Sequence, residues 1–135
     1  MAVTDALNRY FDAWNAHDGE AVVAALTDDG TYEDPTTGGP ISGDALAANV
    51  DALAAGFPDL HFDIESAGPT SETSAAAQWR MLGTHTGDSP MGPATGAAVD
   101  LPGADFFTYD PDADRISKVV GYFDTGLMFR QLGAA

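Results

Sequence analysis

The sequence contains no cysteine and only one lysine, Lys118. Without cysteine the chain cannot form disulfides, thiolate metal sites or a cysteine nucleophile. No stretch approaches the ~20 apolar residues that are needed to cross a bilayer. The N-terminal segment also has neither the basic start nor the long apolar run of a signal peptide. We therefore expect a cytoplasmic protein without membrane contact.

Basic residues are few in general, with five Lys and Arg against 21 Asp and Glu and a net charge of −16. Asp supplies 17 of the acidic residues. A field of this sign repels nucleic acid and anionic membranes, so we expect neither as a partner. One explanation of the charge is a generic acidic chain from a GC-rich genome. The other, which we favour, is adaptation to a salty (halophilic) cytoplasm, where salt screens the self-repulsion.

The 135 residues have the size of one domain, and 44% of them are apolar, which is enough for a core. We expect a single domain over residues 1–135. Helical spacing of apolar residues predicts helices over residues 3–16, 19–26, 43–55 and 126–132. Alternation predicts strands over residues 31–34, 60–65, 73–86, 97–110 and 114–123. Helices followed by an antiparallel meander indicate the α+β class, in which a curved sheet around the first helix would enclose a cone-shaped cavity.

Several short motifs occur along the chain in a characteristic order. They include Asn15-Ala16-His17-Asp18, Thr31-Tyr32-Glu33-Asp34-Pro35, Phe57-Pro58-Asp59, Gly83-Thr84-His85-Thr86-Gly87, Asp105-Phe106-Phe107 and Tyr122-Phe123-Asp124-Thr125. Over nearly the whole chain these motifs resemble the nuclear-transport-factor-2-like superfamily, in its SnoaL-like and ketosteroid-isomerase-like branches. The resemblance implies a cystatin-like cone, with a curved antiparallel sheet wrapped around an N-terminal helix and three or four helices in all. It also implies a homodimer that forms through the outer face of the sheet.

The resemblance suggests four catalytic residues. Tyr10 holds the place of a tyrosine on the first helix of ketosteroid isomerases, and Asp34 matches the general base of their Glu-Asp-Pro segment. Asp105 matches a protonated Asp in a late strand of the same enzymes. In SnoaL-like polyketide cyclases the base lies near the end of the last strand instead, where Asp124 falls.

Each of these residues also has a structural interpretation. Tyr10 lies on the apolar stripe of the first helix and could be a core residue, and Asp34 could be a turn residue. Asp124 could cap the final helix. Asp105 and Phe107 are two residues apart in a predicted strand and therefore share a face. If that face is inward, a role for Asp105 is expected, because a carboxyl group is rarely buried without one.

The chain departs from the isomerase pattern in the helix after Asp34. The isomerases carry a further tyrosine there, and Ala48-Asn49-Val50-Asp51 has none. The segment 87–96 and the ending 124–133 are more similar to the cyclase branch. A limonene-epoxide-hydrolase-like interpretation requires an Arg two residues before the late-strand Asp, where this chain has Gly103.

The chain has more large apolar side chains than a minimal core needs, so we expect some of them to contact a ligand. The substrate-binding candidates are Trp14, Phe57, Trp79, Met81, Phe107 and Tyr122, with His85 at the pocket mouth. His85 could equally be a strand-end residue with a backbone hydrogen bond. The three histidines are scattered and no metal-binding spacing occurs. We therefore expect no metal and no cofactor.

The leading hypothesis is a cofactor-free isomerase or cyclase that abstracts a proton α to a carbonyl of a hydrophobic small molecule. Asp34 or Asp124 would be the base, while Tyr10 and Asp105 would stabilise the enolate. The alternatives are a SnoaL-like polyketide cyclase that uses Asp124, and a non-catalytic ligand-binding or dimerisation module of the same fold.

Overall fold

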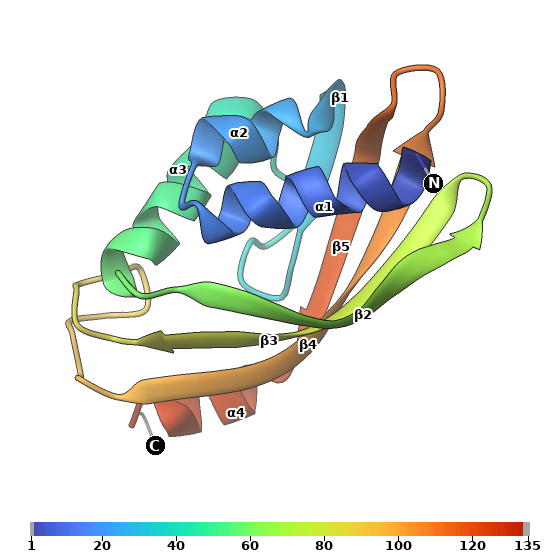
Figure 1. Cartoon of the computed structure of the whole chain (residues 1–135). Coiled ribbons are helices and arrows are strands. Elements are labelled where there is room, and N and C mark those ends of the chain that lie inside the picture. The colour runs from blue at the N-terminus through green and yellow to red at the C-terminus, as the bar shows by residue number, and fades with distance from the viewer. Residues whose placement is uncertain (1, 134–135) are drawn as a thin grey trace.

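The computed structural model describes residues 2–133, and four consecutive strands follow the first three helices and β1 (Figure 1). The helices are α1 (Ala2–Asn15), α2 (Gly19–Ala24), α3 (Gly43–Gly56) and α4 (Thr125–Gln131). The strands are β1 (Leu26–Glu33), β2 (His61–Ser71), β3 (Ser74–Thr84), β4 (Ala98–Asp110) and β5 (Arg115–Phe123). None of the helices within residues 2–133 is long and apolar enough to cross a membrane.

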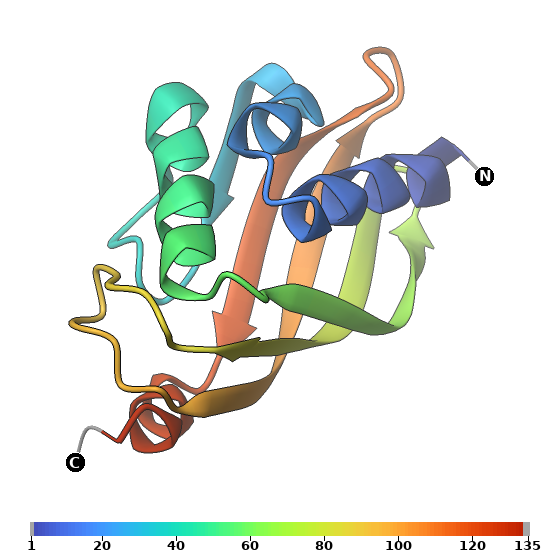
Figure 2. The same cartoon turned by 60° about the vertical axis from the view of Figure 1, so that its left-hand side comes forward.

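The five strands form one curved sheet in the order β1-β5-β4-β3-β2. Strands β2 to β5 are the expected antiparallel meander. The sheet wraps around α1, and α2 and α3 lie on the same side of it (Figures 1 and 2). The predicted α+β cone is therefore confirmed. The sheet is mixed, because β1 pairs in parallel with β5.

Helix α1 forms because its large apolar residues recur at helical spacing and make one buried stripe. Val3, Leu7, Tyr10 and Trp14 are buried along this stripe. The end of α1 is tied to β2 by Asn15, whose amide donates to the Phe62 carbonyl and accepts from the Phe62 N–H. This pair of hydrogen bonds sets how far α1 reaches into the cone, and with it the positions of Tyr10 and Trp14.

Asp28-Asp29-Gly30 has the residue types of a turn and would predict one, but these residues lie inside β1. The pairing with β5 shifts register between Leu26 and Thr31. A Cβ atom at Gly30 would lie 2.8 Å from Leu26 Cβ, so glycine is what lets the chain bulge here. The turn-forming residues thus mark an irregularity within a strand.

The outer face of the sheet carries two exposed aromatic side chains. Phe106 is 53% exposed and Tyr122 is 58% exposed, and their rings meet edge to face at 5.7 Å. They come from the neighbouring strands β4 and β5, on the face opposite to Asp105 and Gly121. Homodimer formation through this face stays a prediction.

Candidate active site

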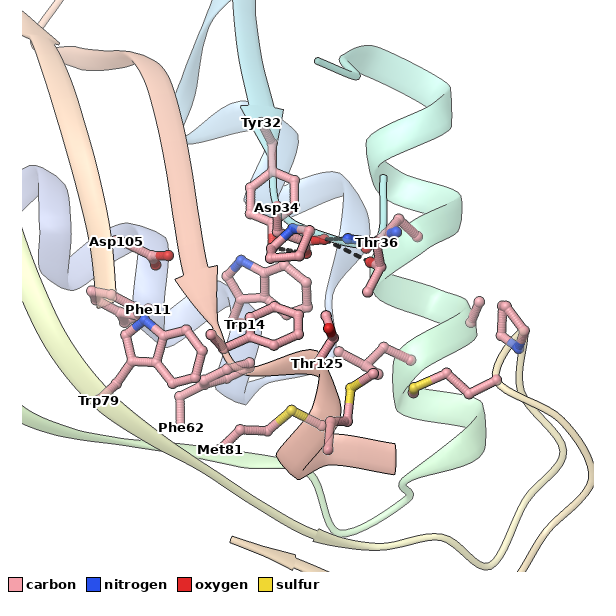
Figure 3. Close-up of a pocket in the computed structure, with 18 of the residues that line it drawn as sticks. Phe11, Trp14, Tyr32, Asp34, Thr36, Phe62, Trp79, Met81, Asp105 and Thr125 are labelled. Atoms are coloured by element: carbon pink, nitrogen blue, oxygen red, sulfur yellow. Dashed lines mark hydrogen bonds between the residues drawn. The ribbon is translucent and has the colours of Figure 1, made fainter. Parts of the chain in front are cut away.

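A cavity of about 600 Å³ lies between the concave face of the sheet and helices α1, α3 and α4. Its walls are mainly aromatic, from Tyr10, Phe11, Trp14, Tyr32, Phe62, Trp79, Phe123 and Phe129. Asp34 and Asp105 are its acidic groups, and none of the described residues that line it is basic. Figure 3 shows the two carboxyl groups among these rings. A mostly apolar pocket with a few polar groups is typical of a small-molecule site.

Asp34 follows the end of β1 and is held by three hydrogen-bond donors. Its Oδ2 accepts from the Tyr32 hydroxyl at 2.6 Å. Its Oδ1 accepts from the Thr36 N–H at 2.7 Å and from the Thr36 hydroxyl at 2.6 Å. The contacts to Thr36 are the local turn that Asp forms with the residue two positions on. A carboxylate offers about four acceptor positions, so Oδ2 keeps one free for a substrate proton.

Asp105 lies on the inward face of β4 and is 5% exposed. Burial raises the pKa of its carboxyl from the ordinary value of 3.8 to about 7. The neighbouring Trp79 indole N–H lowers the pKa, and the negative charge of Asp34 raises it. Near neutral pH a large share of Asp105 is therefore protonated and can donate a hydrogen bond.

Tyr10 reaches the same space from α1 and is 1% exposed. Its ring packs edge to face on Phe11 at 5.2 Å and on Phe107 at 5.5 Å, which fixes its orientation. Burial raises the pKa of its hydroxyl well above the ordinary value of 10, and the charge of Asp105 adds to the effect. The hydroxyl therefore stays protonated and is available as a donor.

The two carboxyl groups come together through the sheet register. Asp105 is paired with Gly121 in β5, and Glu33 of β1 is paired with Val120, so Asp34 follows beside Gly121. A Cβ atom at Gly121 would lie within 4 Å of both Asp105 and Asp34. The two carboxyl side chains thus flank a position without a side chain, at one end of the cavity.

Among the other predicted residues, Trp14, Trp79 and Met81 line the cavity. Three predicted residues are buried elsewhere. Phe57 and His85 stack on each other at 5.0 Å behind α3, and Phe107 lies deeper in the core, against α1. His85 is held between the hydroxyls of Ser89 and Thr95, each at 3.2 Å. The structure gives these three side chains packing contacts and no place on the cavity wall.

Two predicted residues at the end of β5 face away from the cavity. Tyr122 lies on the outer face, and Asp124 is exposed and caps α4, where its Oδ1 accepts from the Leu127 N–H at 3.0 Å. Tyr122 and Asp124 are two residues apart, whereas Val119, Gly121 and Phe123 are the residues near the end of β5 that face inward. A shift of one residue reverses the face of every side chain in a strand.

Sequence reasoning missed two residues that contact Asp34. Tyr32 lines the cavity and Thr36 supplies two of the donors. The sequence holds a signal for both of them. Tyr32 and Asp34 are two apart in a strand and share a face, while Asp-Pro-Thr is a favourable sequence for a side-chain turn.

Within residues 2–133, no three His, Asp or Glu side chains gather closely enough to hold a metal ion.

Comparison with solved structures supports the fold. A candidate SnoaL-like polyketide cyclase from Jannaschia sp. CCS1 superposes with a TM-score of 0.83 at 20% identity, covering 99% of this chain and 93% of its own. A candidate polyketide cyclase from Pseudomonas putida KT2440 gives 0.80 at 26% identity, with coverages of 97% and 98%. A protein with a ketosteroid-isomerase-like fold from Catenulispora acidiphila, in complex with trimethylamine, gives 0.80 at 18% identity, with coverages of 96% and 93%. A search of curated proteins finds no match.

The family itself is shown by the sequence. The family model of the SnoaL-like domain matches residues 7–119, which span most of the helices and strands and include Tyr10, Asp34 and Asp105. The match agrees with the cone-shaped fold and with the structural neighbours. The chain belongs to the SnoaL-like domain family.

Proposed function

We propose that this protein catalyses, without a cofactor, the removal of a proton from a carbon next to a carbonyl group in a hydrophobic small molecule. One observation carries the proposal: Asp34 and Asp105 share one apolar cavity but have opposite environments. Asp34 accepts hydrogen bonds from three donors on its two oxygen atoms. Asp105 is buried among apolar groups, which favour its neutral form. Pairs of acids in contrasting environments are suited to separate base and acid roles.

In the proposed reaction, the free position on Asp34 Oδ2 takes the proton from the carbon. The electron pair of the C–H bond moves into the new C=C bond, and negative charge develops on the carbonyl oxygen. Tyr10 and protonated Asp105 donate to that oxygen, where hydrogen bonds in a water-poor cavity are most effective. The enolate then either regains a proton at another carbon, which is isomerisation, or attacks a second carbonyl of the same molecule, which is cyclisation.

Proton exchange tests the step that both reactions share. A hydrophobic ketone such as 2-tetralone, incubated in D₂O with the protein, should exchange its α-hydrogens faster than with buffer alone, as followed by NMR. Absorbance of a β,γ-unsaturated ketone as it becomes conjugated tests isomerisation separately. Asp34→Asn should lower the exchange rate by roughly 10²- to 10⁴-fold, because positioned acid–base groups contribute on that scale. Asp63→Asn, at an exposed position of β2, is the matched control.

A second candidate function is binding of a small amine without catalysis. Two carboxyl groups lie within aromatic walls, and none of the lining residues in the range 2–133 is basic. This arrangement suits an ammonium ion, which is attracted to the faces of Trp and Tyr rings. The Catenulispora protein was solved with trimethylamine, which also supports this candidate. Saturable binding of trimethylammonium together with no catalysed exchange of any ketone would favour it over the enzyme.

A further inference from the structure

The indole nitrogen of Trp79 stands out among the buried polar atoms of residues 2–133. It is the only buried side-chain nitrogen or oxygen in that range without a hydrogen-bond partner. Leaving a buried N–H unpaired costs free energy, and native proteins rarely do so without a reason. The same side chain lines the cavity that also holds Asp105.

The indole ring is held in one orientation by its neighbours. It lies over Gly103, where a Cβ atom would come within 2.3 Å of Trp79 Cη2. It also packs edge to face on Phe62 at 5.2 Å and is tilted against Phe123 at 6.5 Å. Glycine in β4 is therefore what makes room for the ring, and the direction of the N–H follows from this packing.

The N–H of Trp79 is directed to the end of the cavity that holds Asp105. Figure 3 shows the nitrogen-bearing edge of the ring turned towards that carboxyl group. Trp79 and Asp105 lie on the same face of β3 and β4, two register positions apart, because Trp79 pairs with Gly103 and Ala77 pairs with Asp105. An oxygen atom of a ligand that contacts Asp105 would thus also lie within reach of Trp79.

We propose that Trp79 binds substrate through its indole N–H, which donates to the same ligand oxygen as the Asp105 carboxyl. The pair selects molecules that present a carbonyl, enolate or phenol oxygen at this end of the cavity and disfavours pure hydrocarbons. The proposal rests on the proposed function for the identity of that oxygen. It assigns to Trp79 a polar role in addition to its aromatic contact.

The test uses 2-naphthol as a probe with an oxygen and naphthalene as the matched probe without one. The chain has two tryptophans, Trp14 and Trp79, so a ¹⁵N–¹H spectrum of the wild-type protein contains two indole signals. Trp79→Phe assigns them. We expect 2-naphthol to move the Trp79 proton signal downfield, as a new hydrogen bond does, while naphthalene produces only the ring-current shifts common to both probes.

Affinity gives a second readout on the same variant. Trp79→Phe removes the N–H and keeps an aromatic ring, so 2-naphthol should bind about tenfold more weakly while naphthalene affinity changes much less. A purely structural role of Trp79 would weaken both probes equally. Tyr122→Phe, which removes a hydroxyl on the outer face, should leave both affinities unchanged.

The proposal is overturned if 2-naphthol binds no more tightly than naphthalene, or if the Trp79 signal responds alike to both. The comparison of the two affinities can be read from the wild-type protein even if Trp79→Phe does not fold. Failure of the proposed function looks different. If ketones do not exchange their α-hydrogens but 2-naphthol still moves the Trp79 signal, the cavity binds oxygen-bearing ligands without catalysing proton abstraction.

Discussion

Gly121 of β5 lies opposite Asp105 of β4, and a Cβ atom at Gly121 would come within 2.8 Å of Asp105 Oδ1. The same Cβ would lie 3.6 Å from the Cβ of Asp34. The two acids can therefore share one end of the cavity only because the residue between them has no side chain.

Replacing Gly121 with alanine should disturb catalysis more than stability. The atom that must move is the end of the Asp105 side chain, which can rotate away. A displacement of about 1 Å at a catalytic group can lower a rate by roughly 10²-fold. We expect Gly121→Ala to lower the exchange rate of 2-tetralone by at least about tenfold while the protein stays folded, as judged by circular dichroism and urea unfolding.

Gly68→Ala in β2 is the matched control, because a Cβ atom there meets nothing within 4 Å. Its stability should change by less than about 0.5 kcal/mol. An unchanged exchange rate in Gly121→Ala would contradict the packing of Asp105 described above.

The raised pKa of Asp105 predicts how stability depends on pH. Between its ordinary pKa of 3.8 and its folded value of about 7, the folded protein holds this proton more tightly than the unfolded chain does. The contribution of Asp105 to stability is therefore fully present below about pH 4 and is lost as the pH rises to about 7. The loss amounts to at most about 4 kcal/mol, since one pKa unit corresponds to about 1.4 kcal/mol.

Asp105→Asn should remove this dependence, because the amide has the same shape and does not titrate. Urea unfolding of both proteins at pH 4.5, 6 and 8 measures the difference. The wild type should lose stability relative to Asp105→Asn across this range. The pKa values of Asp59 and Asp114 are lowered, so these two groups titrate at lower pH and do not affect the comparison. Parallel curves for the two proteins would show that Asp105 is not buried as described.

Variants of Asp124 distinguish between the two candidate bases, Asp34 and Asp124. Asp124→Asn keeps a side-chain oxygen for the Leu127 N–H and so preserves the cap of α4. We expect Asp124→Asn to exchange ketone protons at the wild-type rate, and Asp124→Ala to lose about 1 kcal/mol of stability through the missing cap. Loss of exchange in the folded Asp124→Asn variant would instead identify Asp124 as the base and move the reaction away from the cavity described here.

The charge of the chain predicts a dependence of stability on salt, and we propose halophilic adaptation as its cause. The net charge is −16, and the ion pairs among residues 2–133 are three partly exposed pairs of Arg with Asp, which contribute little. Screening of self-repulsion should therefore raise the melting temperature between 0.1 and 2 M KCl. The effect should shrink near the sequence pI of about 4.1, where little net charge is left to screen. Equal melting temperatures in both salts at pH 7 would refute the proposal.

Much of the fold follows from local patterns in the sequence. The stripe of Tyr10 and Trp14 predicts the buried face of α1, and the alternation around Asp105 predicts its inward direction. Asp18 caps α2 as its residue type suggests, accepting from the Ala21 N–H. Each of these features depends on residues that are close together in the chain. The spacing of apolar residues in the sequence therefore predicts them directly.

Only the tertiary structure decided which face of β5 is inward and which acids meet. The alternation in β5 is compatible with either face, and the choice of Gly121 over Tyr122 comes from pairing with β4 and from the parallel contact with β1. The sequence by itself determined the α+β class, the family and the chemical types available, including the acids and the tyrosine. The convergence of Asp34, Asp105 and Trp79 on one cavity depends on the register between strands distant in the chain, and that register results from packing of the whole sheet around α1.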